Sequence, residues 1–422
     1  MSQLFEQIQP YKNLLKNFTS LSVLQLTNYL FPIIVLPYVV RILGPDKYGL
    51  VQFAAAFNAY FLLLCDYSFG LTGTRLISQH RNDSQKLSEI FSSIIFIKII
   101  FYIITFLLLV ILIYSIERFH EEWLVYLFSS GMVLGSVLSP LWYFQGIEQM
   151  KYITMLQVAS RTIATIFIFI LIQTNSDYLI LVIINSSSQL AIGLSGLIVC
   201  ILKFKIQISF PGSDRIMKLL KEGWNIFLSS ISINVYTTSN TFVLGLFASD
   251  TVVGYYAAAD KIRIAFQGMQ STLSLSVFPF VSKLVKESYS AFINFNRKLL
   301  KISVGSGLIV SLILFIYADD LVNIILGKSF SHSTDLLRII SVLPILISFS
   351  NVFGIQTMLP LGYDKSFNKI IGFAALVHII LLLIFVPHYL ADGVAYTVVI
   401  TESIVTSFMF VYLRYKKINL FS

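Results

Sequence analysis

Three charged residues interrupt a long apolar stretch in the segment GYYAAADKIRIAF, which begins at Gly254. They are Asp260, Lys261 and Arg263. Counted from an outer membrane boundary near Thr251, the two cations lie ten and twelve residues in, or about 15 to 18 Å along a helix. A charge at that depth costs at least a few kcal/mol unless it faces a cavity or a partner. These residues are therefore the first candidates for a functional site.

The spacing of these charges allows two interpretations. Asp260 and Arg263 are three residues apart and can pair on one face of a helix, which leaves only Lys261 to be explained. Alternatively, the membrane boundary lies elsewhere and all three charges are at the surface. The alignment of this segment with an uninterrupted apolar span that begins near Gly49 argues against that alternative. We expect Lys261 and Arg263 to line a cavity, with Asp260 as the partner that holds Arg263 in place.

The composition identifies the class of protein. Hydrophobic residues make up 56% of the chain and charged residues 12%, with a mean hydropathy of +0.81, which lies outside the range of soluble domains. A chain of 422 residues has room for about a dozen helices of about 20 apolar residues each. We therefore predict a multi-pass membrane protein without a separate soluble domain.

Hydropathy and the positions of Gly, Pro and charged residues place twelve spans along the chain. With the amino terminus inside, 21 of the 30 Lys and Arg residues fall in cytoplasmic loops or tails and five in outer loops. This asymmetry follows the positive-inside rule and predicts that both termini are cytoplasmic. The predicted spans are 18–40, 48–70, 90–114, 123–145, 153–173, 178–202, 223–247, 252–280, 299–318, 336–360, 366–386 and 390–413.

The longest cytoplasmic connection divides these spans into two groups of six. We expect an amino-terminal half over 1–202, a basic linker over 203–222 and a carboxy-terminal half over 223–422. A weak internal repeat supports the division, because 41–56 and 245–259 share a short turn followed by Gly and then three alanines. We therefore predict an all-α membrane protein with about twelve transmembrane helices in two parallel six-helix halves around a central cavity.

Three stretches also carry a resemblance to a known family. The chain resembles the polysaccharide-transport branch of the multidrug/oligosaccharidyl-lipid/polysaccharide flippase superfamily, most of all Wzx-type O-antigen flippases, in PYVVRILGPDKYGLVQFAAAF, PLWYFQGIEQMKY and VVGYYAAADKIR. The resemblance runs over essentially the whole chain. It implies a protein of the bacterial inner membrane. Such a protein moves an undecaprenyl-diphosphate-linked oligosaccharide, an O-antigen or capsule repeat unit, from the cytoplasmic to the periplasmic leaflet.

Such a substrate sets the requirements for the site. Its diphosphate needs cations, its sugars need hydroxyl or amide side chains, and its lipid tail needs an opening to the bilayer. Lys261 and Arg263 supply cations at mid-membrane. Arg161 and Arg75 can extend a cationic surface toward the cytoplasm, although Arg75 also fits a positive-inside anchor. The remaining candidates are amides that contact sugar or hydrogen-bond neighbouring helices, and tyrosines that stack on sugar rings: Asn28, Gln52, Asn58, Asn234, Asn240, Tyr255 and Tyr256.

Four ionisable residues are candidates for ion coupling or structural pairing: Asp66, Asp260, His378 and Glu402. Asp66 lies near the inner end of the second span and can pair with Arg75 or Lys98. His378 and Glu402 lie at similar depth in the last two spans, where they can form a proton relay. The alternatives are a buried hydrogen-bonded pair, or two residues that never meet.

The sequence contains no motif typical of an enzyme or a metal site. It has no Walker A loop and no GxGxxG, GxSxG or HExxH motif, its five histidines lack metal-ligand spacing, and its two cysteines lie in separate spans. We expect no enzyme activity, no metal and no cofactor. The basic residues are spread over loops, so no nucleic-acid partner is expected either. Energy coupling would then come from an ion gradient, from a partner, or from synthesis and removal of the substrate.

Two alternative functions belong to other classes. An ion-coupled multidrug antiporter of the same superfamily would rely on intramembrane carboxylates, which are few here. A membrane glycosyl polymerase would need a sizeable outer loop, whereas the longest outer connection covers only about 319–335. For the favoured flippase the partners are the lipid-linked oligosaccharide and bilayer lipid, and the resemblance adds the polysaccharide polymerase and chain-length machinery.

Overall fold

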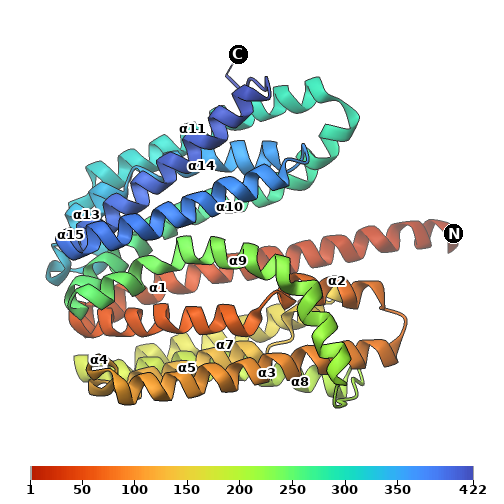
Figure 1. The fold of residues 1–422 in the computed structure, drawn as a ribbon, viewed down its shortest axis with the longest axis horizontal. Helices are drawn as coiled ribbons and strands as arrows, with labels where there is room; N and C mark the ends of the chain where they lie inside the picture. The colour runs from red at the N-terminus through yellow and green to blue at the C-terminus, as the bar shows by residue number, and fades with distance from the viewer. Residues whose placement is uncertain (1, 422) are drawn as a thin grey trace. The chain divides into compact units, whose positions relative to one another are not determined.

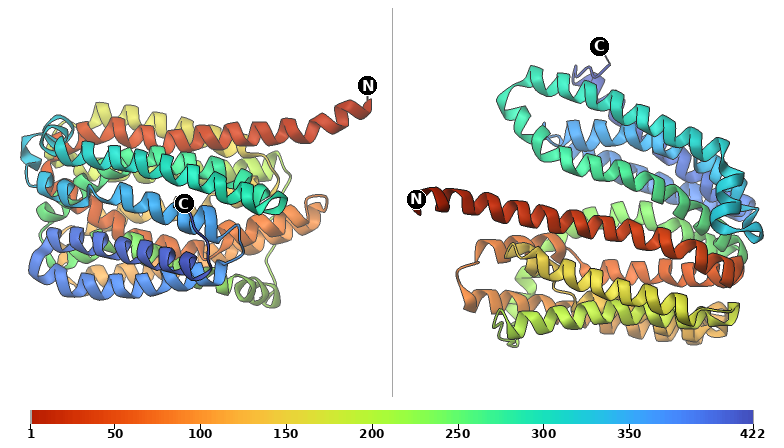
Figure 2. Two further views of the ribbon diagram at one scale, coloured as in Figure 1. Left: turned by 90° about the horizontal axis from the view of Figure 1, so that it is seen from above. Right: turned by 180° about the vertical axis from the view of Figure 1, so that it is seen from behind.

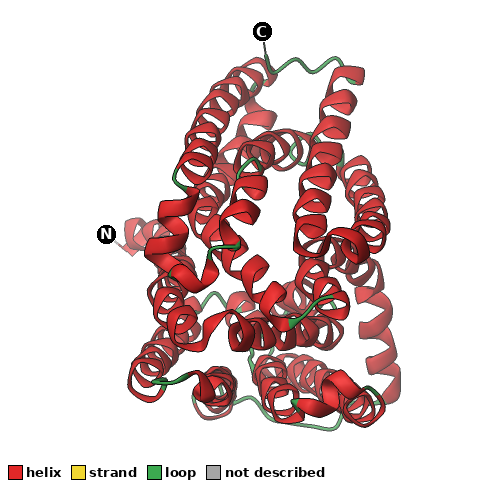
Figure 3. Ribbon diagram, turned by 90° about the vertical axis from the view of Figure 1, so that its left-hand side faces the viewer, coloured by secondary structure: helices red, strands yellow, loops and turns green. Residues whose placement is uncertain are grey.

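A computed structural model of the chain consists of helices joined by short loops. The backbone is described for residues 2–421, and no strand occurs in that range (Figure 3). The side chains are described over the same range except for 2–26, 28–29, 229, 232–233, 235–237, 269–273 and 275–276.

The chain forms two compact units. Unit 1 consists of Met1–Tyr38 and Ala54–Ile231, and unit 2 consists of Val39–Phe53 and Ser232–Ser422. The segment 39–53, which the sequence places in the amino-terminal half, therefore packs with the carboxy-terminal part of the chain. The expected division into 1–202, a linker and 223–422 stays a prediction.

Unit 1 is a bundle of long helices, coloured red to green in Figure 1. Within it, α5 packs along α8, α8 along α7, and α3 along α5, while α2 packs against α6. Aromatic side chains such as Phe91, Trp142 and Phe144 fill its core. Its helices are α1 (Ser2–Asp66) apart from the segment 39–53, α2 (Phe69–Gln79), α3 (Ser84–Ser115), α4 (Glu117–Glu121), α5 (Trp123–Leu138), α6 (Leu141–Gly146), α7 (Met150–Leu171), the 3-10 helix η1 (Asn175–Asp177) and α8 (Tyr178–Leu202).

Unit 2 is a second bundle, reached through α9, which runs from unit 1 into unit 2. The helix α10 packs against α11 and α13, and α15 packs against α13 and α14 (Figure 2). The helices are α9 (Ser213–Phe247), α10 (Asp250–Glu287), α11 (Tyr289–Ile316), α12 (Ala318–Leu321), η2 (Val322–Leu326), η3 (Lys328–Phe330), α13 (Ser333–Ile340), α14 (Leu343–Ser350), η4 (Asn351–Met358) and α15 (Asp364–Tyr415).

Two of these helices each contain two predicted spans. The backbone leaves the helical conformation at Gly44 (φ 69°) in α1 and at Leu390 (φ 47°) in α15. Among the described residues, eight helical stretches are long and apolar enough to cross a membrane, and they include both broken helices. Together with α9 and α10 they account for the twelve predicted spans. The chain is therefore an all-helical, multi-pass membrane protein.

The structure differs from the predicted spans at three places, one of which is the break between α5 and α6 inside the predicted span 123–145. The helix α9 begins at Ser213, so only the first half of the predicted linker 203–222 is non-helical. Its first turns are amphipathic, and Leu219 is buried against the core of unit 1, which explains why hydropathy alone missed this part. The predicted span 336–360 is broken into α13, α14 and the π-helix η4, with Pro344 in the first turn of α14.

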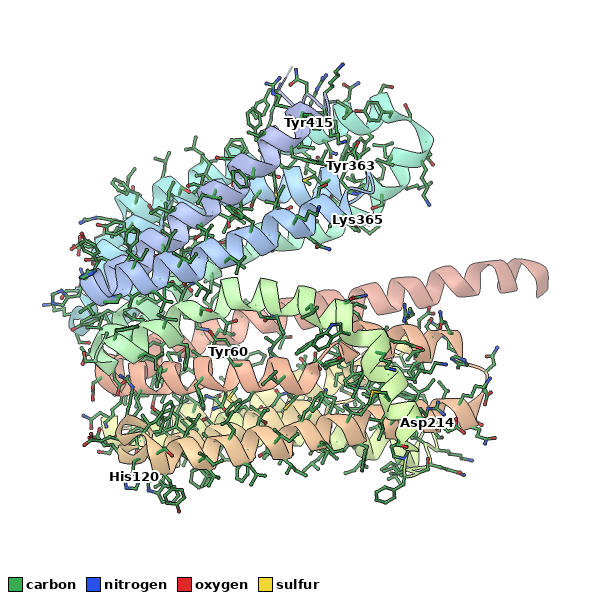
Figure 4. All side chains as sticks on the ribbon, viewed as in Figure 1. Tyr60, His120, Asp214, Tyr363, Lys365 and Tyr415 are labelled. Atoms are coloured by element: carbon green, nitrogen blue, oxygen red, sulfur yellow. The ribbon has the colours of Figure 1, made fainter. Side chains whose placement is uncertain are left out.

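The ends of the helices fall where alternating spans require. In unit 1, His120 in the short helix α4 lies at the opposite end from Asp214 at the start of α9 (Figure 4). In unit 2, both ends of α15 meet, because Tyr363 packs edge-on against Tyr412 and Lys416 lies over the Tyr363 ring. Consecutive spans therefore run in opposite directions, and the second span of each pair brings the chain back to the end of the bundle at which the first began.

A close crossing of two helices joins the two copies of the internal repeat within unit 2. A Cβ added to Gly49 would lie 1.7 Å from the carbonyl oxygen of Asp250, and one added to Gly254 would lie 2.0 Å from that of Pro45. Pro45 and Asp250 each lie four residues before the glycine of their own copy. The repeat thus places equivalent residues against one another. Glycine is needed at both positions so that the two backbones can approach.

Replacing either glycine of this crossing by alanine should destabilise the protein. We expect Gly49→Ala or Gly254→Ala to lower the free energy of unfolding by about 3 kcal/mol, because the new methyl group overlaps a backbone carbonyl and the helices must separate. The measurement is the temperature at which detergent-solubilised protein loses its monodisperse peak in size-exclusion chromatography.

Two other glycines are matched controls. Gly305 and Gly372 also lie within helices, but a Cβ added to either meets nothing within 4 Å. Alanine at these positions should raise the stability by about 0.5–1 kcal/mol through helix propensity. Equal melting temperatures for all four variants would contradict a tight crossing.

Candidate functional site

The charges of α10 form a local network inside unit 2. The Arg263 Nε donates a hydrogen bond of 2.7 Å to Asp260 Oδ1, and its Nη2 lies 2.7 Å from the same oxygen. The third guanidinium nitrogen, Nη1, donates to the amide oxygen of Gln267. Arg263 is thereby held on the surface of its own helix, three and four residues from its partners. This is the arrangement expected from the spacing of Asp260 and Arg263.

Lys261 differs from its neighbours on α10. The side chains around it, Ala258, Ala259 and Ile262, are buried in unit 2, whereas Lys261 is exposed. No acidic side chain in the described part of the chain forms an ion pair with it. Lys261 is therefore a cation that points away from the core of unit 2, eleven residues past the first residue of α10.

The two tyrosines before these charges have different surroundings. Tyr256 is only 1% exposed, so its ring is enclosed by unit 2. Tyr255 is half-buried, and its ring lies 5.1 Å from that of His332 and 6.1 Å from that of Phe330. In this conformation only Tyr255 offers part of a ring for stacking. Sugar stacking by either residue stays a prediction.

His378 and Glu402 each form hydrogen bonds with other polar side chains. The ring nitrogens of His378 lie 3.0 Å from Thr401 Oγ1 and 3.0 Å from Asn240 Oδ1. The Glu402 carboxylate accepts a 2.6 Å hydrogen bond from Ser350 Oγ. Both residues are buried. The structure therefore brings Asn240 of α9 together with the last two spans, a link that the sequence did not indicate.

The other candidates of unit 2 lie in less distinctive surroundings. Gln52 lies half-buried in the 39–53 segment, and Asn234 is half-buried in α9. A further polar cluster was missed in the sequence. Ser274 Oγ donates to Asn351 Oδ1 at 2.5 Å, and Gln356 Nε2 donates to Ser274 Oγ at 2.8 Å. Asn351 and Gln356 belong to η4, and such π-helical interruptions often occur at functional sites.

In unit 1, Asp66 pairs with Lys98. The Lys98 Nζ donates to Asp66 Oδ1 at 3.1 Å and to the Ser136 carbonyl at 3.3 Å. Lys98 is 2% exposed and Asp66 is 47% exposed. Of the two partners that the sequence allowed for Asp66, the structure forms this one, because Arg75 lies 3.9 Å from Glu222 instead.

The remaining candidates of unit 1 do not gather at one place. Arg75 is exposed near the end of α2, and Arg161 is half-buried on α7. Asn58 is buried and donates a 2.6 Å hydrogen bond to Ser129 Oγ, so it joins α1 to α5 as interhelical hydrogen bonds do. The side chain of Asn28 lies outside the described side chains.

Comparison with known proteins identifies the family. A family model described as "Polysaccharide biosynthesis protein" matches residues 14–285. The chain belongs to this family. A relative from Escherichia coli (strain K12) is 33% identical over 407 residues, covering 96% of this chain and 98% of its own. One from Shigella dysenteriae is 30% identical over 401 residues, covering 93% and 98%. Both are named "Putative O-antigen transporter", which confirms the resemblance seen in the sequence.

Solved structures show that this member of the family shares its fold with flippases and transporters. The lipid II flippase MurJ in an inward closed conformation superposes with a TM-score of 0.71 at 15% identity, covering 96% of this chain and 87% of that one. An inward-facing multidrug resistance MATE family transporter of the MOP superfamily gives 0.68 at 14% identity, covering 92% and 94%. The superpositions establish the fold, and at these identities they establish the fold alone. None of these relatives is described as an enzyme, in agreement with the expectation of a transporter.

The Asp66–Lys98 pair predicts unequal effects of removing its two members. Asp66→Asn should lower the free energy of unfolding by about 2–3 kcal/mol, because the buried Lys98 ammonium then keeps only the Ser136 carbonyl. Lys98→Met should cost less, about 1 kcal/mol, because methionine suits a buried site and the half-exposed Asp66 can rehydrate. Thermal melting of purified protein measures both.

The double variant Asp66→Asn, Lys98→Met is the control for the pair itself. It should melt closer to the native protein than Asp66→Asn does, because no unpaired charge remains. A larger loss for Lys98→Met than for Asp66→Asn would mean that Lys98 is reached by water and is not a buried cation.

Proposed function

We propose that this protein is a flippase that moves an undecaprenyl-diphosphate-linked oligosaccharide from the cytoplasmic to the periplasmic leaflet of the bacterial inner membrane. The family, the full-length similarity to relatives named as O-antigen transporters and the flippase fold support this class of substrate. The positive-inside pattern supports cytoplasmic termini. The polysaccharide polymerase and chain-length machinery would act on the saccharide once it reaches the outer leaflet.

The observation that carries the mechanism is the exposed cation Lys261 on α10. A lysine at mid-membrane without an acidic partner is unfavourable unless it meets water or an anion. A diphosphate supplies such an anion, and an ammonium group binds phosphate oxygens through charge-assisted hydrogen bonds. Lys261 would hold the diphosphate while the protein changes between inward-open and outward-open states. Arg263, held by Asp260 and Gln267, would add positive potential beside it.

The charges also argue against the antiporter alternative. A cation antiporter needs an intramembrane carboxylate that can exchange its proton or ion for a substrate. Here Asp66 is bonded to Lys98 and Asp260 to Arg263, so each of these carboxylates already has a fixed cation. Glu402 is the carboxylate that remains as a candidate for coupling flipping to an ion gradient. The sequence places His378 at a similar depth in the neighbouring span.

Neutral substitution of Lys261 tests the proposal. Lys261→Gln should reduce the amount of surface polysaccharide at least tenfold, since the loss of a charge-assisted contact of about 1.5 kcal/mol or more corresponds to about that factor. Lys261→Arg, which retains the charge, should export far more. The readout is surface polysaccharide resolved on gels from cells that depend on this protein, at equal membrane levels of each variant.

Lys283→Gln is the matched control. Lys283 lies on the same helix, is exposed, and pairs with Glu287 near the carboxyl end of α10. Its substitution should leave export unchanged. Normal export by Lys261→Gln, or by the double variant Lys261→Ala, Arg263→Ala, would overturn the role given to these cations.

A further inference from the structure

A polar pocket lies inside unit 1, apart from the charges of α10. Its volume is about 180 Å³. It is formed by seven helices of unit 1, α1 to α3 and α5 to α8. The residues that line it include Asp66 at the end of α1, Lys98 of α3, Trp142 and Gln145 of α6, Gln157 of α7 and Gln189 of α8. A polar pocket in a membrane bundle is costly to maintain. It therefore calls for an explanation by function.

The charges in this pocket already balance. Lys98 is bonded to Asp66 and to the Ser136 carbonyl, so neither an unpaired cation nor an unpaired carboxylate faces the pocket from this pair. A diphosphate would meet the Asp66 carboxylate, and a free cation would meet the Lys98 ammonium. The pocket therefore suits a neutral polar ligand. Such a ligand can enter beside Asp66, whose side chain is 47% exposed.

The amides around the pocket retain unused hydrogen-bonding capacity. Gln145 accepts a 3.2 Å hydrogen bond from Thr74 through its oxygen, which leaves its NH2 group to donate. Gln157 and Gln189 are half-buried, and neither amide forms a hydrogen bond with the described part of the chain. Trp142 is 2% exposed, and its indole Nε1 is buried without a partner among the described residues. The pocket thus combines several donors, several acceptors and an aromatic ring.

We propose that this pocket binds one sugar ring of the transported saccharide. A pyranose presents hydroxyl groups that both donate and accept, and amide and carboxylate side chains match them. The volume suits a single ring rather than an oligosaccharide, since pockets for drug-sized ligands are larger, at about 300–1,000 Å³. The inference rests on the proposed function, and it assigns the recognition of sugar to unit 1.

The three tryptophans of the chain make a direct binding test possible. Trp123 and Trp224 are exposed, so replacing both with phenylalanine should leave the fold intact and keep Trp142 as the only indole reporter. Purified protein with this background is titrated with D-glucose, D-galactose and N-acetyl-D-glucosamine into the high millimolar range. We expect a saturable change in Trp142 emission with at least one of the three sugars.

Variants of the glutamines decide whether the response arises in the pocket. Gln157→Leu, Gln189→Leu should weaken the apparent affinity at least tenfold, since two hydrogen bonds to the ligand are lost. Gln173 lies just past the end of α7 and outside the pocket. Gln173→Leu should therefore leave the apparent affinity unchanged. If the double variant does not give a monodisperse protein, Gln189→Asn, which keeps the amide but shortens it, takes its place with a smaller expected loss.

A native response that none of the pocket variants alters, or no saturable response to any of the three sugars, would overturn the pocket assignment. Surface polysaccharide from the same variants separates this failure from that of the proposed function. Export by the native protein without any sugar response would leave the flippase standing and remove the pocket. A saturable sugar response in a protein that exports no polysaccharide would keep the sugar pocket and overturn the flippase.

Discussion

A charge inside a membrane must be paired or must face water, and most of the polar structure of this protein follows from that constraint. Lys98 lies deep in unit 1 and is neutralised by Asp66, and Arg263 in unit 2 is neutralised by Asp260. The buried His378 and Glu402 have hydroxyl and amide partners. Once these groups are accounted for, Lys261 stands out as an exposed cation of α10 that forms no ion pair with the described part of the chain. Its environment, rather than its charge alone, makes it informative.

The two regions proposed to bind substrate differ in chemistry. The α10 region of unit 2 offers net positive charge, which suits phosphate. The pocket of unit 1 is balanced in charge and rich in amides, which suits hydroxyl groups. A lipid-linked saccharide carries both kinds of group on one molecule. A division of recognition between a charged and a neutral region would let one protein hold the constant diphosphate strongly while it discriminates among sugars by hydrogen-bond geometry.

Much of the fold could be predicted from the sequence, because spans are long and apolar and their ends are marked by charge. The spans 90–114, 153–173 and 178–202 agree closely with α3, α7 and α8. The start of α9 was missed because its first turns are amphipathic and carry Lys218 and Lys221, so their mean hydropathy is that of a loop. The breaks in α13, α14 and η4 were missed because hydropathy does not record backbone hydrogen bonding.

The site could be predicted only in part, for a related reason. Pairs within one helix, such as Asp260 and Arg263, follow from spacing alone. Pairs between helices, such as Asp66 with Lys98 or Asn240 with His378, depend on the rotation of each helix about its axis, which one sequence does not define. Two of the pocket glutamines, Gln145 and Gln157, were passed over for the same reason. Gln145, Gln157 and Gln189 lie on three different helices, and only the packing of unit 1 brings them together.

The crossing at Gly49 and Gly254 also bears on how the protein is made. The segment 39–53 packs with unit 2, yet its partner in α10 is synthesised about 200 residues later, or roughly 10 to 40 s at 5 to 20 residues per second. During that interval the two spans of α1 are in the membrane without α10 as their neighbour. The backbone at Gly49 is then exposed to lipid or to the insertion machinery. The segment 39–53 therefore reaches its final packing only after α10 has been synthesised. A chain truncated before α10 is a poor candidate for a stable folding intermediate.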